Sequence, residues 1–253
     1  GIVVLGGFNT VDIVNPDISG CEIGVLVEDD TVNVSGGAIQ GGGTEASYNS
    51  SGILALSGST VSVSGTEIFD MWSTDITPSG EAPGATGPEA GFGVVAYDID
   101  VDGEAPGGPA GANVAFSDCC DIHHNLVGVG IGPSAEVSAN GCNIRDNVIA
   151  VAAFLSGSPG TTDGGFDFEY NWWGSEEGPG LIPDGFDDPD DWYNYITSGI
   201  DYTPWLDAPC PQGNPVGMGA RFTPSARSGT AGDSVQFTDV STPPPGCVID
   251  SWM

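Results

Sequence analysis

The sequence predicts an all-β chain in which short strands stack as the coils of a solenoid. Residues 116–132 and 138–154 align without a gap at a period of 22 residues and share a Cys-x-Ile-x-x-Asn pattern. Apolar residues alternate with polar ones in Val32–Val34 and Val61–Val63, which is the period of a strand with one buried face. Strands that recur every ~20–25 residues are typical of solenoid coils, which stack their inward side chains on one another.

The repeat extends more loosely in both directions. Residues 24–39 resemble residues 52–68, because each segment has a Gly-aliphatic start, a Val-x-Val strand and a terminal Ile. Residues 166–171 continue the series, with Phe168 in the place of the Ile and Asn171 in the place of the Asn. We therefore expect one buried column, made of Ile39, Ile68, Ile122, Ile144 and Phe168. A β-sandwich is the alternative, but its successive strands need not carry the same residue at the same place.

Three Gly/Pro/Ala-rich stretches interrupt the repeat, at residues 40–51, 77–91 and 103–112. Insertions in a repeat fold emerge as loops, so these stretches would frame any binding surface.

The repeat resembles that of the right-handed parallel β-helix proteins, the group that includes pectate-lyase-like folds. An Ile-x-x-Asn followed by a Gly/Ala-Val strand occurs at 122–129 and again at 144–151. The segment "NWWGSEEGPG" (171–180) followed by "DYTPWL" (201–206) looks like the ending common in surface β-helix proteins. This resemblance covers roughly residues 10–206. It implies a right-handed parallel β-helix over residues 1–180 and a C-terminal cap and linker over 181–217, but no reaction.

Two adjacent indoles, Trp172 and Trp173, follow the last repeat. The open end of a stacked core must be covered by terminal coils, and large aromatic rings supply the apolar area to do so. We expect Trp172 and Trp173 to form this core cap; an aromatic platform for sugars is the alternative.

The repeat stops after residue 206 and a Pro/Gly-rich linker follows. Residues 218–253 resemble the start of a PKD-type immunoglobulin-like domain, and the matching positions are Phe222, Gly232, Val235, Phe237, Asp239 and Ser241. About 35 residues cannot make a sandwich of ~100 residues. We therefore expect an incomplete PKD-like segment, a partial β-sandwich whose strands either continue in a longer chain or pair with another partner. The resemblance implies a spacer or contact module of surface proteins.

The composition is strongly acidic. The 253 residues contain 3 Lys+Arg, all of them arginine, against 35 Asp+Glu, for a formal net charge of −32. Nucleic acid and anionic membranes would repel such a surface. Salt near 1 M shortens the screening length to about 3 Å and removes most of the self-repulsion, which favours a high-salt habitat. An acidic secreted protein from ordinary water, or one neutralised by calcium, is the alternative.

Several features favour an extracellular, cell-surface protein. Sequons place candidate glycosylation sites at Asn33 and Asn49, and six cysteines fit an exported chain. No apolar run approaches the ~20 residues of a membrane helix, so no membrane insertion is expected within this chain.

The cysteines divide into two groups. Cys210 and Cys247 lie in Pro-rich sequence outside the repeat, and we expect a Cys210–Cys247 disulfide. The register places Cys120 directly over Cys142, as a buried reduced ladder or, alternatively, as a disulfide.

The sequence offers only weak candidates for metal sites; no cofactor is required, and calcium is the one that the acidic motifs favour. Asp98, Asp100 and Asp102 resemble the first half of an EF-hand loop, but Pro109 stands where the loop requires Glu. They are therefore expected to form an outward acidic row, with weak calcium binding as the metal candidate; residues 186–192 are a second acidic candidate.

A further motif, "CCDIHHN" (119–125), could be a zinc or copper site because Cys and His bind these metals. Its spacing matches no standard zinc pattern, however, and His123 and His124 are expected on opposite faces of a strand. Arg145 is expected beside His123 one coil away, balanced by Asp146. No constellation specific enough to be catalytic is found.

We therefore expect a non-catalytic structural or adhesion protein that contacts surface glycans, surface proteins or other copies of itself. A polysaccharide-active enzyme or glycan-binding β-helix is one alternative. A subunit of an extracellular filament or surface layer, joined by tail strands, is the other.

Overall fold

The computed structural model describes residues 1–6, 10–42, 50–72, 91–96, 111–132, 134–153, 166–181, 194–197 and 199–213, and three short strands beyond them. Within these ranges every regular element is a β-strand. Among the described residues, no helix has the length and apolar character needed to cross a lipid bilayer.

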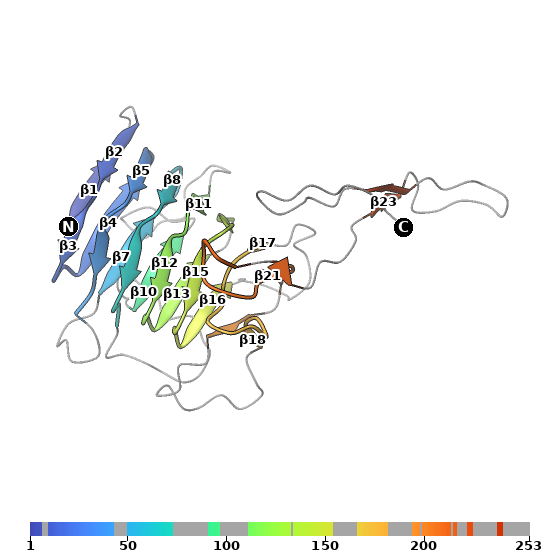
Figure 1. Ribbon diagram of the computed structural model, residues 1–253. Helices are drawn as coiled ribbons and strands as arrows, with labels where there is room; N and C mark the ends of the chain where they lie inside the picture. Colours follow the sequence, from blue (N-terminus) through green and yellow to red (C-terminus); the bar gives the residue numbers. More distant parts are fainter. Residues whose placement is uncertain are drawn as a thin grey trace.

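Successive coils of the chain contribute one strand each to three parallel sheets (Figure 1). Sheet A contains, in spatial order, β1 (Ile2–Leu5), β4 (Ile23–Glu28), β7 (Ser51–Ala55), β10 (Phe92–Ala96), β13 (Val127–Ile131), β16 (Ile149–Ala153), β19 (Tyr195–Ile196) and β18 (Gly180–Leu181). Sheet B contains β2 (Val11–Val14), β5 (Thr31–Ser35), β8 (Thr60–Ser64), β11 (Asn113–Ser117) and β14 (Glu136–Ala139). Sheet C contains β3 (Asp17–Ser19), β6 (Ala38–Gln40), β9 (Glu67–Phe69), β12 (Asp121–His123) and β15 (Asn143–Arg145). This stack of all-parallel strands is compatible with a parallel β-helix.

The predicted strands and most of the predicted column are confirmed. Val32–Val34, Val61–Val63, Val114–Phe116 and Val129–Ile131 all lie in parallel sheets. In sheet C, Ile39 pairs with Ile68, Ile68 with Ile122 and Ile122 with Ile144, and all four are fully buried.

The fifth member of this column is Trp173, so the prediction of Phe168 at that place is wrong. A parallel bridge joins Asn143 to Trp172, which places Trp173 beside Ile144. Phe168 is buried in the same core one element earlier, and its ring lies 6.5 Å from that of Trp173. The core therefore ends on a large indole stacked over the isoleucines.

A ladder of buried asparagines runs beside the isoleucine column. The Oδ1 atom of Asn147 accepts hydrogen bonds from the backbone and side-chain nitrogens of Asn125, at 3.1 Å each. In the same way, the Oδ1 atom of Asn194 accepts hydrogen bonds from the backbone and side-chain nitrogens of Asn147, at 3.3 Å each. The predicted place of Asn171 in this ladder is therefore wrong. Asn171 is fully buried at another corner, where it accepts from the Cys142 backbone and donates to Ala139 and Phe168.

Glycines at the start of the sheet A strands make room for this ladder. A Cβ atom on Gly128 would lie 2.6 Å from the carbonyl oxygen of Ala150 and 3.1 Å from Nδ2 of Asn147. A Cβ on Gly93 would lie 2.7 Å from the carbonyl oxygen of Gly128. Only glycine allows the coils to approach this closely without rearrangement.

The outer face of sheet A carries a second apolar cluster. Leu54, Phe92, Val95 and Ala152 are buried there, separate from the main core. Gly130 lies beneath the ring of Phe92, since a Cβ at this position would come within 2.6 Å of Cε1. Both faces of the middle of sheet A are therefore shielded from solvent, so β7, β10 and β13 are buried along their whole length and do not alternate between buried and exposed residues.

The C-terminal elements close one end of the stack. They are β17 (Phe166–Asp167), β20 (Ile200–Asp201), β21 (Trp205–Leu206) and β22 (Pro215–Val216). Of the two predicted cap residues, Trp173 is only 1% exposed and belongs to the core, whereas Trp172 faces outward and is half-buried. Trp205 packs against the core and donates from Nε1 to the carbonyl oxygen of Glu176.

In the tail, β23 (Phe222–Pro224) and β24 (Phe237–Asp239) pair with each other as antiparallel strands. This pairing is that of a β-hairpin-like unit.

The disulfide differs from the prediction. Cys210 is bonded to Cys119, with the two Cα atoms 5.5 Å apart, so the expected Cys210–Cys247 pairing is wrong. Cys119 lies in the turn before β12, and the backbone nitrogen of Cys210 also donates to Oδ1 of Asn143 on the neighbouring strand. The stacked coils thus bring Cys119 to the segment that carries Cys210, whereas Cys247 lies outside the described residues.

Cys120 and Cys142 are buried free thiols, as expected for the reduced ladder. The hydrogen bond with Cys142 lowers the pKa of the Cys120 thiol. The contact with Cys120, together with burial, raises the pKa of the Cys142 thiol well above its usual range. Both effects favour the protonated form of the Cys142 thiol.

Candidate functional site

The outer face of sheet C brings the chemically versatile side chains of the chain together. The register places Glu67 beside Asp121, and Asp121 beside Asn143. A second outward column runs parallel to it: Phe69 is paired with His123, and His123 with Arg145. Because outward side chains alternate with the buried isoleucines, the two columns lie on either side of the Ile column and on the same surface.

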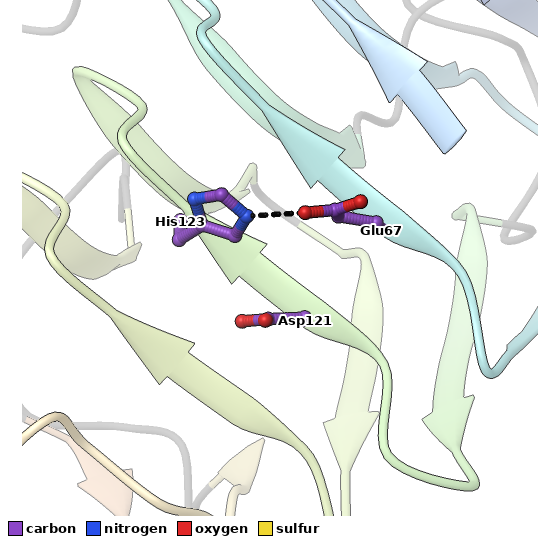
Figure 2. Close-up of side chains that lie close together, drawn as sticks. All are labelled: Glu67, Asp121 and His123. Carbon is purple, nitrogen blue, oxygen red and sulfur yellow. Dashed lines mark hydrogen bonds and ion pairs between the residues drawn. The ribbon is translucent and has the colours of Figure 1, made fainter. Parts of the chain in front are cut away.

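His123 is the centre of this group. Its Nε2 atom lies 3.0 Å from Oε1 of Glu67, and its ring stacks on Phe69 with the centroids 5.1 Å apart and an interplanar angle of 11°. His123 is only 8% exposed, whereas the Glu67 side chain is 48% exposed. Figure 2 shows the imidazole of β12 directed toward the carboxylate of the neighbouring strand. The imidazole is thus fixed by packing, and its polar partner reaches it from the solvent side.

His124 joins the group, although His123 and His124 were expected on opposite faces. Strand β12 ends at His123, and His124 has a left-handed backbone with φ of 53°. This turn brings the two Nδ1 atoms within 2.7 Å, with the rings in an edge-to-face contact. The prediction of opposite faces assumed that the strand continues for one more residue, and it is wrong for that reason.

Arg145 neutralises part of the surrounding charge, as expected. Its guanidinium is 2.8 Å from Oδ2 of Asp121 and 2.8 Å from Oδ2 of Asp146. Burial opposes ionisation of Arg145, but the hydrogen bonds to the two carboxylates outweigh it and raise the pKa of the guanidinium. The group as a whole therefore contains three carboxylates, those of Glu67, Asp121 and Asp146, and one permanent positive charge.

One carboxylate oxygen in the group has no hydrogen bond. Oδ1 of Asp121 is buried and has no partner among the described residues, while Oδ2 is held by Arg145. Glu67, Asp121 and His123 can each offer a ligand atom, and these atoms lie within 4.8 Å of one another. In the part of the chain that the structure describes, this is the only such trio of potential metal ligands. A mixed set of one imidazole and two carboxylates can hold a divalent cation or bind and transfer a proton.

The other predicted sites are placed as follows. Asn33 lies on the outer face of sheet B, where its Nδ2 atom donates to Oδ1 of Asp12 at 2.8 Å. Asn49, the acidic row Asp98, Asp100 and Asp102, and residues 186–192 lie outside the described residues. The glycosylation and calcium sites stay predictions.

The sequence alone did not single out Glu67. Glu67 and His123 are 56 residues apart in the chain, and an insertion separates their coils. The signal that could have found it is the isoleucine column: once Ile68 is aligned with Ile122, Glu67 must stand beside Asp121.

No protein-family model, no curated protein and no solved structure matches this chain. The site is therefore interpreted from its geometry and chemistry alone.

Proposed function

We propose that the chain is a right-handed parallel β-helix that serves as a rigid, non-catalytic structural or adhesive element of an extracellular cell-surface protein from a high-salt habitat. The observation that carries this proposal is the location of the recurring residues. The Ile column and the Asn ladder, which are the residues that the sequence repeats, are all buried and bond one coil to the next. The repeated residues thus hold successive coils together, which supports a role in building a long and stiff stack.

The outer face of sheet B is the surface best suited to adhesion. Its outward columns consist mainly of small hydroxyl and amide side chains: Thr31, Thr60 and Asn113 form one column, and Asn33, Ser62 and Ala115 form another. Neighbouring strands lie about 4.8 Å apart, so these groups form a regular array. Such an array can hydrogen-bond a glycan, and the net charge of −32 favours neutral glycans or partners bound through cations.

A co-sedimentation assay tests this function. The full chain is mixed with neutral and acidic polysaccharides in molar NaCl, and bound protein and newly formed chain ends are both measured. We expect binding without cleavage, and loss of binding when Ser62→Arg places a bulky side chain on sheet B. Gln40→Arg adds the same charge on sheet C and is the matched control. Cleavage that disappears in Glu67→Gln would instead favour the polysaccharide-active alternative, because a carboxylate-held imidazole is a possible acid or base.

Assembly into a filament or surface layer is the second candidate, supported by the first coil. Val3, Leu5 and Val14 are 59%, 43% and 66% exposed, and they lie on β1 and β2, each of which has a single neighbour in its sheet. Free strand edges with exposed apolar side chains pair readily with another chain. Molecular mass measured by light scattering in molar NaCl should then rise with protein concentration, and Val14→Lys should keep the chain monomeric. A wild-type chain that stays monomeric at all concentrations would rule out this candidate.

A further inference from the structure

We propose that Glu67, Asp121 and His123 form a binding site for a divalent transition-metal ion of the zinc type, and that His124 accepts the Nδ1 proton of His123 when the metal is bound. This site is independent of the proposed structural function. The acidic motifs of the sequence pointed to calcium elsewhere in the chain. The Cys/His motif at 119–125 was considered for zinc or copper, but nothing in the sequence connected it with Glu67 or with a contact between the two imidazoles.

The donor set selects the class of ion. Calcium and magnesium are bound by oxygen atoms only, whereas an imidazole together with carboxylates suits zinc and its neighbours in the first transition row. Nε2 of His123 and Oε1 of Glu67 are 3.0 Å apart, close to the roughly 3.3 Å that separates two ligands of a tetrahedral zinc ion with bonds of about 2.0–2.1 Å. The half-exposed Glu67 side chain can move aside to admit the ion, while the buried imidazole of His123 stays in place. Water would complete the coordination.

We assign the third ligand to the carboxylate of Asp121, which offers one oxygen within 4.8 Å of the other two ligand atoms. Its Oδ2 atom is fixed by Arg145, so the carboxylate is oriented while Oδ1 is left buried and without a hydrogen bond. A buried carboxylate oxygen without a partner is unfavourable. A cation bound there would remove that cost, and the excess of three carboxylates over one guanidinium favours its entry.

His124 supplies the orientation that a metal-ligating histidine needs. Such a histidine donates its second ring N–H to a neighbouring acceptor, which fixes its tautomer. Without metal, with both rings neutral, His123 donates from Nε2 to Glu67 and His124 donates from Nδ1 to Nδ1 of His123. With metal on Nε2, His123 carries its proton on Nδ1 and donates it to Nδ1 of His124, whose own proton moves to Nε2. Both rings stay neutral, so no net proton is gained or lost.

Calorimetric titration of the metal-free full chain with Zn²⁺ tests the site, with Ca²⁺ as the comparison ion. About 1 M NaCl suppresses diffuse binding to the acidic surface. We expect one Zn²⁺ per chain, and an affinity that falls at least about tenfold in Glu67→Gln and in His123→Gln. The matched control is Asp70→Asn, which removes one carboxylate from the same coil but outside the trio. It should leave the affinity unchanged.

Nitrogen NMR of the imidazoles provides a readout that does not depend on affinity. Bound Zn²⁺ should give His123 a metal-ligated Nε2 and a protonated Nδ1, and His124→Ala should weaken binding about 10–100-fold while His123 remains the ligand. Glu67 is half exposed, so Glu67→Gln should keep its urea-unfolding midpoint and remain a valid test. Equal loss of affinity in Asp70→Asn, or a His123 imidazole whose signals do not change with Zn²⁺, would overturn the proposal.

Discussion

Oδ1 of Asn147 accepts two hydrogen bonds from Asn125, one from the backbone nitrogen and one from the side-chain nitrogen, across a single coil boundary. Nδ2 of Asn147 in turn donates to the backbone carbonyl of Ile122. The buried side-chain amide of Asn147 therefore pairs with both a backbone N–H group, that of Asn125, and a backbone carbonyl group, that of Ile122, in the preceding coil. The same relationship recurs between Asn147 and Asn194, so the ladder couples three successive coils.

Substitution of Asn147 by alanine should be among the most damaging single changes. It removes the acceptor of Asn125 and the donor to Ile122, and each buried polar group left unpaired costs about 1–3 kcal/mol. We expect a loss of at least about 3 kcal/mol in the free energy of unfolding, measured by urea titration in molar NaCl. Asn140→Ala, an exposed asparagine of the same coil, is the control and should change stability by less than about 0.5 kcal/mol. Equal effects of the two variants would refute the structural role of the ladder.

Gly128→Ala should destabilise the stack, although it adds only one methyl group. The new Cβ would lie 2.6 Å from a backbone carbonyl of the next coil, which cannot rotate away. Overpacking of this kind costs about 1–3 kcal/mol in unfolding free energy.

The next coil carries Ala150 at the equivalent place, where the register toward β19 is irregular. Ala150→Gly serves as the comparison and should cost no more than about 1 kcal/mol. A Gly128→Ala protein as stable as the wild type in urea would show that the coils can separate without penalty.

The melting temperature should rise strongly with salt. The formal net charge is −32, and the Debye length falls from about 10 Å at 0.1 M to about 3 Å at 1 M salt. Thermal unfolding followed by circular dichroism in increasing NaCl measures the effect, and KCl should act equally because the cause is screening. A flat or falling curve would remove the argument for a high-salt habitat. A rise with millimolar calcium at constant ionic strength would instead support a calcium site.

Peptide mapping without reduction should recover Cys119 linked to Cys210. Trypsin cleavage after Arg145 and Arg227 places Cys119, Cys210 and Cys247 on different peptides, and an Asp-specific protease separates Cys142 from the adjacent Cys119 and Cys120. The disulfide closes a loop with a sequence separation of 91, for which the loop-entropy relation gives a contribution of about 4.5 kcal/mol to stability.

Alkylation before the same mapping experiment tests the buried Cys142 thiol. Because the pKa of the Cys142 thiol is raised, this thiol stays protonated and should resist alkylation in the folded protein, whereas it should react once urea unfolds the chain. Recovery of Cys210 linked to Cys247 would contradict the structure.

The architecture could be predicted because the repeat is exact where it matters. Ile122 and Ile144 occupy identical places in two ungapped copies, and the inward column of a stack demands this identity. The end of the column could not be predicted in the same way. Phe168 and Asn171 reproduce the repeat spacing, but they do not continue the column and the ladder. Trp173 follows Ile144 in the isoleucine column, and Asn194 follows Asn147 in the asparagine ladder.

Of the candidate site, only the contact between residues adjacent in sequence could be predicted. Arg145 and Asp146 are neighbours in sequence, and their ion pair followed from the sequence alone. The contact of His123 with Glu67 depends on the pairing of β9 with β12, which an insertion hides from a simple alignment. The two histidines meet because His124 has a positive φ, which the alternation rule for strands does not anticipate.

The disulfide between Cys119 and Cys210 also determines how the protein would carry mechanical load. A pulling force applied at the tail reaches Cys210 and passes through the sulfur–sulfur bond directly to Cys119 beside β12. The intervening segment, including the Trp173 cap, lies inside the closed loop and would bear no tension. Unfolding in a single-molecule extension experiment would then release a contour length shorter by roughly 300 Å than after reduction, since each of the 91 residues adds at most about 3.3–3.6 Å.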